Sequence, residues 1–180
     1  MLLRLCRKVT VRDATVQGMD DIEVPGLGTL SKDVHRSYGG AVGGPYHEIV
    51  LVSWLAEIDW PSGERVTLTV REDLEPLTPQ AIKSAGERAL AFREREAQSR
   101  REVAERMLDL ANLWWASGED DAEVPLTAHT FLDKIRLSEI VVEDKSFTAY
   151  YDDNEVIFAG HALQVEFNAN FKLVDTNIPG

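Results

Sequence analysis

Residues 78–115 constrain the fold most, because their apolar side chains follow the spacing of a long helix. These side chains recur every three or four positions near both ends of the stretch, which is typical of an amphipathic helix. Thr78 is a favourable N-cap, and Pro79 suits the first helical position because its missing N–H has no partner there. Residues 93–106 are mostly charged or polar. We therefore predict one helix over residues 79–115, straight or with a bend, whose middle faces solvent.

Residues 47–71, which precede this helix, predict a β-hairpin. Apolar residues in 47–60 recur with period two, as expected of a strand with one buried face. The side chains on that face are Val50, Val52, Trp54, Ala56, Ile58 and Trp60. Residues 61–64 are rich in turn formers, and the return strand 65–71 alternates in the same way. The hairpin is expected to pack on the helix.

The last third of the chain predicts a short helix at residues 127–135 and then a β-meander. Its strands are expected at residues 139–142, 147–152, 156–167 and 171–176. The connections between them are only a few residues long, so neighbouring strands should be antiparallel. The predicted fold class is α+β: an antiparallel β-sheet packed against one long central helix and a short helix, with a C-terminal meander. We expect a single domain over residues 1–180, with its N-terminal β region ending near residue 72.

The charge of the chain narrows the class of partner. Its net charge is −12, and the part after residue 117 holds thirteen acidic residues against four basic ones. Nucleic acid is disfavoured because phosphate binding needs clustered Lys and Arg, whereas a basic protein partner is favoured. No apolar run has membrane length, so no membrane partner is expected. The single cysteine, Cys6, fits a reducing compartment, so we expect a cytoplasmic protein.

No motif for a cofactor or a metal is recognisable. The glycine-rich stretch 39–45 lacks the Lys-Ser/Thr pair of a phosphate-binding loop. The acidic stretch 118–123 lacks the ligand spacing of a calcium-binding loop. The histidines His35, His47 and His129 are scattered along the chain. We therefore predict no cofactor and no metal.

His161 is the best candidate for a reactive side chain. In the predicted strand 156–167 it is the polar exception on an apolar face, and Asp152 and Asp153 stand across the predicted turn. A histidine oriented by a carboxylate is a common general base. The candidate site is therefore His161, Asp152, Asp153 and the adjacent Tyr151. The alternative is a structural histidine that hydrogen-bonds backbone inside the core.

Several short motifs occur in a characteristic order. They are Leu27-Gly28, then Leu108, Asn112 and Trp115 at the helix end, then Leu126-Thr127, Phe131-Leu132, residues 135–140, Tyr151-Asp152-Asp153 and residues 158–161. In this order the chain resembles the bacterial domain-of-unknown-function family 2262, from about residue 24 to residue 180. The resemblance implies an α+β fold and no particular activity. By analogy, small acidic bacterial domains of this kind suggest a partner-binding role, such as that of an immunity protein against a toxin.

Two functional hypotheses follow. The first is a non-enzymatic protein-binding module whose acidic C-terminal surface meets a basic partner. Its candidate contacts are Glu119, Asp120, Asp121 and Glu155, beside Asp152 and Asp153. The second is an enzyme or small-ligand binder in which His161, Asp152 and Asp153 converge in a cleft.

Overall fold

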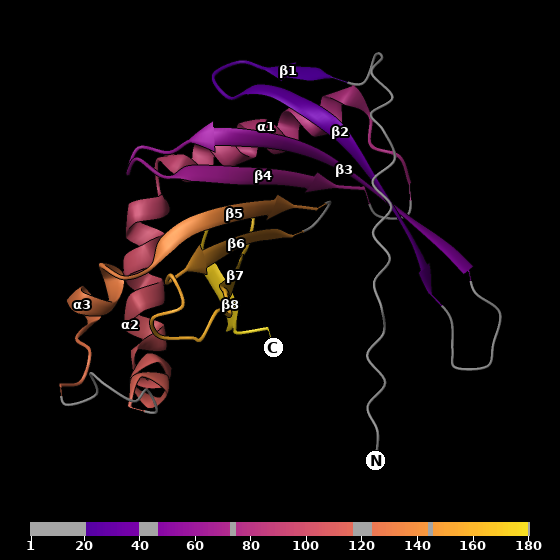
Figure 1. Ribbon diagram of the computed structural model, residues 1–180. Coiled ribbons are helices and arrows are strands. Elements are labelled where there is room, and N and C mark those ends of the chain that lie inside the picture. The colour runs from indigo at the N-terminus through magenta and orange to yellow at the C-terminus, as the bar shows by residue number, and fades with distance from the viewer. Residues whose placement is uncertain (1–20, 40–46, 73–74, 117–123, 144–145, 180) are drawn as a thin grey trace.

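The computed structural model describes residues 21–39, 47–72, 75–116, 124–143 and 146–179 (Figure 1). Within these ranges eight strands form one sheet, in the order in which they occur along the chain. The strands are β1 (Ile22–Val24), β2 (Gly28–Gly39), β3 (His47–Asp59), β4 (Arg65–Arg71), β5 (Arg136–Val142), β6 (Phe147–Asp152), β7 (Leu163–Phe167) and β8 (Leu173–Asn177). The helices are α1 (Pro79–Arg93), α2 (Glu96–Trp115) and α3 (Ala128–Leu132).

All neighbouring strands are antiparallel except β4 and β5, which are parallel. A parallel pair needs a long crossover, and here the crossover contains all three helices. The α+β fold class and the C-terminal meander are confirmed. The two predicted β regions are joined edge to edge at β4 and β5 into one sheet. The single-domain boundary stays a prediction.

The long helix is in fact two helices, which is a correction to the single rod in the predicted fold. The chain leaves α1 at Glu94, where the N–H of Arg95 donates to the carbonyl of Phe92 at 2.8 Å instead of continuing the α-helical pattern. Figure 1 shows α1 lying along strands β2 to β4 and α2 running across that direction. The expected solvent-facing middle is also wrong in part, because Glu96, Ser99 and Val103 are buried. The bend lets each helix bury its own face against the sheet.

Thr78 caps α1 as predicted, since its hydroxyl accepts a hydrogen bond from the N–H of Ala81 at 3.2 Å. The end of α1 is fixed by Phe92, which is fully buried. Its ring centroid lies 4.9 Å from that of Phe147, 5.2 Å from Phe167 and 5.5 Å from Phe171. This aromatic cluster packs the helical layer on β6 and β7, and contacts of this geometry add to the burial of apolar area.

The predicted hairpin is confirmed as β3 and β4. Trp54, Ala56, Ile58 and Trp60 are buried on its inner face, as expected. Val50 is not, because β2 and β3 extend beyond the helical layer as a protruding two-stranded ribbon (Figure 1). Strand β2 lies within the predicted N-terminal β region, in which the sequence analysis defined no strand before residue 47. Of the described helices, none has the length and apolar character needed to cross a membrane.

The predicted strand 156–167 is wrong over its first half, since β7 begins only at Leu163. The chain turns instead, with left-handed φ angles at Asn154, Glu155, Ala159 and Gly160. Such angles are incompatible with a continuous strand. The buried side chains of this loop are the adjacent Ile157 and Phe158, whereas Ala159 is exposed, so the alternation over 157–161 does not mark a buried strand face.

Candidate functional site

Asp153 stabilises the loop that follows it. Its side chain is only 2% exposed, and its carboxylate accepts hydrogen bonds from the backbone N–H groups of Glu155, Ile157 and Phe158. Its neighbour Asp152 is exposed and accepts a bond from the N–H of Asn154 at 2.6 Å. Both carboxylates therefore stabilise a turn, which is a common role of Asp.

His161 lies at the end of this loop, away from both carboxylates. Its Nδ1 is 3.1 Å from the carbonyl oxygen of Pro179, so this nitrogen carries the proton in that bond. Its ring packs edge-on against Trp114 at 5.9 Å. His161 makes no hydrogen bond or ion pair with Asp152 or Asp153, all three of which lie in the described part of the chain. His161, Asp152 and Asp153, which were predicted to converge, therefore each bond to other groups.

Tyr151 points the other way, into the core, where it meets the start of α2. Its hydroxyl is fully buried and has no hydrogen-bond partner in the part of the chain that the structure describes; it lies beside the ion pair of Glu96 Oε1 and Arg100 Nε at 3.2 Å. Burial raises the pKa of Tyr151 well above its ordinary value of 10.0. Burial also raises the pKa of Glu96, against the opposing effects of Arg100 and of a hydrogen bond from Trp60. This cluster is closed to solvent, so it suits holding α2 on the sheet better than acting on a solute.

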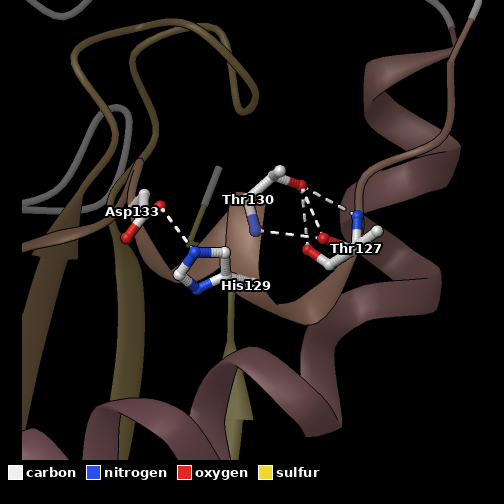
Figure 2. A network of polar contacts seen from close by, with 4 residues as sticks. All are labelled: Thr127, His129, Thr130 and Asp133. Carbon is white, nitrogen blue, oxygen red and sulfur yellow. Dashed lines mark hydrogen bonds and ion pairs between the residues drawn. The ribbon is translucent and has the colours of Figure 1, made fainter.

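Figure 2 shows the polar contacts of α3, which contains another of the scattered histidines. Thr127 and Thr130 form a reciprocal capping box in which each hydroxyl accepts from the other residue's N–H. His129 Nε2 lies 3.6 Å from Asp133 Oδ2, and both side chains are exposed. This is a pair of possible metal ligands one helical turn apart, which the sequence reading overlooked. Across the described ranges, however, no three His, Cys, Asp or Glu side chains gather as a metal site would require.

The sheet face opposite the helices carries a row of carboxylates. Strand alternation and pairing place them on neighbouring strands, from Glu57 on β3 across to Asp175 on β8. We call this surface the carboxylate face and define it by Glu57, Glu139, Glu143, Glu166 and Asp175 around Tyr150. All of them except Glu143, which directly follows β5, stand on paired strands, so their spacing is set by the sheet.

Two of these carboxylates are held in place by threonines of β4. Thr69 Oγ1 donates to Glu139 Oε1 at 2.7 Å, and Thr67 Oγ1 donates to Glu57 Oε1 at 3.0 Å. Each bond joins directly neighbouring strands, so it fixes the rotamer of the acid against a rigid backbone. A surface fixed in this way loses little side-chain entropy when it binds.

Tyr150 stands in the middle of the carboxylate face, opposite Glu139 on β5. Burial raises its pKa above the ordinary value of 10.0; the positive charge of Arg71 opposes this, and the carboxylates Glu139, Glu143 and Glu166 add to it. The phenol therefore stays neutral at physiological pH. A half-buried tyrosine ringed by acids presents an apolar ring and a hydroxyl to an incoming cation.

The sequence reading missed this face. Of the partner contacts predicted from the sequence, Glu155 is exposed in the turn after β6. The other three, Glu119, Asp120 and Asp121, lie outside the described residues. The usable signal was the polar phase of each strand, such as Glu57 between the buried Ala56 and Ile58 on β3. Only the strand pairing shows that the polar side chains of these separate strands lie on one surface.

Two other surfaces stand out. The ribbon of β2 and β3 exposes Val34 by 45%, Leu51 by 54% and Tyr38 by 71%, on both of its faces. A half-open pocket of about 650 Å³ lies between β1–β3 and the start of α1. Its charges are mixed, with Asp21, Glu23 and Glu72 beside two lysines, so it favours neither sign of ligand.

A sequence model of the family described as an uncharacterised protein conserved in bacteria (DUF2262) matches residues 50–178. The match covers most of β3, all of β4 to β8 and all three helices, and so includes the whole carboxylate face. Comparisons with curated proteins and with solved structures gave no significant match.

Proposed function

The chain belongs to the bacterial DUF2262 family, and we propose that it is a protein-binding module that holds a basic segment of a partner protein on the carboxylate face. The observation that carries the proposal is the row of five fixed or exposed carboxylates around Tyr150 on the sheet face that the helices leave open. Lys and Arg side chains complement such a row in charge, and Tyr150 offers them an aromatic ring.

The net charge of the whole chain supports the same class of partner. A charge of −12 attracts a basic protein over a distance of about one Debye length, roughly 8 Å at physiological salt, and repels nucleic acid. Electrostatic attraction of this kind mainly raises the association rate. An immunity protein that covers the basic substrate-binding surface of a toxin would have this chemistry.

The enzyme hypothesis has less support. It needs His161, Asp152 and Asp153 to converge, but Asp153 is occupied by three backbone N–H groups and His161 by Pro179 and Trp114. A carboxylate that already satisfies a buried loop is a poor orienting group for a histidine elsewhere.

In-cell photocrosslinking from position 166 tests the proposal, since Glu166 is exposed within the carboxylate face. We expect crosslinks to a Lys- or Arg-rich segment of another protein, and we expect them to be lost in E57Q/E139Q. With the purified partner, E57Q/E139Q should bind about tenfold more weakly, which corresponds to about 1.4 kcal/mol. The affinity of wild type should also fall as salt is raised.

The matched control is E105Q/D109N, which removes two exposed carboxylates from α2 and makes the net charge less negative by the same amount. A specific face predicts that this control keeps the crosslinks and the affinity. Equal weakening by both double variants would show that only net charge matters, and crosslinks to a segment without basic residues would also overturn the proposal.

A further inference from the structure

Residues 1–12, which we call the basic segment, have the opposite charge to the rest of the chain. They hold four basic residues and no acidic one, in a chain whose net charge is −12. The basic residues are Arg4, Arg7, Lys8 and Arg12. Three of them recur every four positions, so they share one side of the segment whether it is helical or extended. The sequence of the basic segment therefore provides a row of positive charges.

The carboxylate face is a row of the opposite sign. Glu57 and Glu139 stand opposite the same residue of β4, so they lie two strand spacings apart, about 10 Å. Glu166 continues the row on β7, two strands beyond β5. Arg71 pairs with one member of the face, Glu143, at 3.4 Å. The five carboxylates exceed this one cation by four, which matches the charge of the basic segment.

The two rows can meet within one chain. Eight residues separate Arg12 from Asp21, with which the described part of the chain begins next to β1. An extended chain covers about 3.3 Å per residue, so this connection can span about 30 Å. Strand β5 lies four strand spacings from β1, or about 19 Å. The helices lie on the other side of the sheet (Figure 1), so the connection has only to pass the sheet edge at β1.

We propose that the basic segment occupies the carboxylate face of its own chain and competes there with the basic partner. This inference rests on the proposed function, because it names the regulation of the same face. A tethered segment acts at an effective concentration in the millimolar range, so even a weak contact is populated. The partner has to displace the segment, which lowers the partner's apparent affinity. The family match begins at residue 50, so it includes the face and not the basic segment.

A nitroxide spin label on Cys6, the single cysteine of the chain, tests this contact in the absence of any partner. We expect paramagnetic broadening of amide signals around Glu139, Tyr150 and Glu166, and none around Glu105 on the exposed side of α2. The variant R4Q/R7Q/K8Q/R12Q should reduce the broadening at least threefold, and added salt should weaken it. Isotope-labelled protein mixed with spin-labelled protein of natural abundance should show no broadening, because the contact lies within one chain.

K83Q/R95Q/R101Q/R106Q is the matched control. It removes four exposed basic residues from the two long helices and the residue between them, so it changes the net charge equally. It should keep the broadening. The inference is wrong if the face is not broadened, if α2 is broadened equally, if both quadruple variants behave alike, or if the mixed sample shows the same broadening as the single chain.

The affinity of the purified partner then tests the competition. R4Q/R7Q/K8Q/R12Q should bind the partner at least threefold more tightly than the matched control does, and equal affinities would overturn the competition. The two proposals fail separately. Broadening of the face without crosslinks from position 166 would overturn the proposed function and leave the contact within the chain, whereas crosslinks without broadening would overturn only the contact.

Discussion

Asp152 and Asp153 are adjacent in sequence and identical in chemistry, yet the fold gives them different environments. Asp153 turns inward and satisfies three backbone N–H groups, whereas Asp152 stays in solvent and satisfies one. Sequence alone cannot distinguish the two, because the difference arises from the left-handed turn that begins at Asn154. The reactive-looking pair is therefore structural.

Asp153→Ala should destabilise the protein by about 3 kcal/mol, because it leaves buried N–H groups of the loop without an acceptor. Asp152→Ala removes a single exposed bond and should cost at most about 1 kcal/mol. Urea denaturation of both variants measures the difference. If the two variants lost the same stability, the loop would not depend on the inward carboxylate.

Glu96 predicts a pH dependence whose sign follows from its burial. Its folded pKa is raised above the ordinary value of 4.5, mainly because burial penalises the charged form. The folded state thus binds the proton more tightly than the unfolded state does. The resulting stability is fully present below about pH 4.5 and is lost as the pH rises through the folded pKa.

Glu96→Gln stays neutral at every pH, so wild type should lose stability relative to this variant as the pH rises from about 4.5 through the folded pKa. The free energy of unfolding of both proteins, measured by urea denaturation across this range, checks the sign. Glu102→Gln on the exposed side of the same helix is the control and should show no such trend. A wild-type advantage that grew with pH would mean that the ion pair with Arg100 outweighs burial.

Elements with a regular period were predictable from the sequence, and their junctions were not. The strand expected at 147–152 has those bounds in the structure, and the return strand 65–71 does too, because alternation and flanking turn residues define both ends. The helix break at Glu94 carries no Gly or Pro to signal it. The break lets α1 and α2 run in two different directions, each with its own set of buried residues, which is a demand of the tertiary packing and not of the local sequence.

Helix α1 approaches β1 closely at Gly86. A Cβ atom at this position would lie 3.0 Å from Val24 Cγ1 and 3.1 Å from Cγ2. Gly86→Val should therefore destabilise the protein by about 2 kcal/mol through overpacking, although glycine is itself a weak helix former. Urea denaturation measures this loss, and Ala91→Val on the exposed side of α1 should lose only a few tenths.

Combination with Val24→Ala tests whether the loss at Gly86 arises from this contact. Removing the two methyl groups makes room for the new side chain, so the double variant should be at least about 1 kcal/mol more stable than the sum of the two single effects predicts. Strict additivity would place the cause of the loss elsewhere.

At the level of the whole molecule, the carboxylate face exists only because distant segments pair. Glu57 and Glu139 both stand opposite Thr67 of β4, although the crossover with three helices separates them in the chain. The parallel joint of β4 and β5 therefore assembles the surface. Alternation in each strand predicts which side chains are polar, but no local signal predicts which strands become neighbours across a crossover of this length.

The same architecture predicts an uneven distribution of local stability. Strands β4 to β6 have neighbours on both sides and helices over one face, whereas the far part of the β2–β3 ribbon has neither a helix nor a strand beside β2 among the described elements. Its apolar residues Val34 and Leu51 stay half exposed, so little burial opposes its opening.

Native-state hydrogen exchange should therefore be at least about 100-fold faster for amides in residues 33–38 and 48–51 than in residues 66–70 and 139–142. The two groups lie in one sheet. Mass spectrometry of peptic fragments over a time series measures both groups in one sample. Equal protection would mean that the ribbon is covered in solution, and dilution of the protein would then show whether a second copy of the chain covers it.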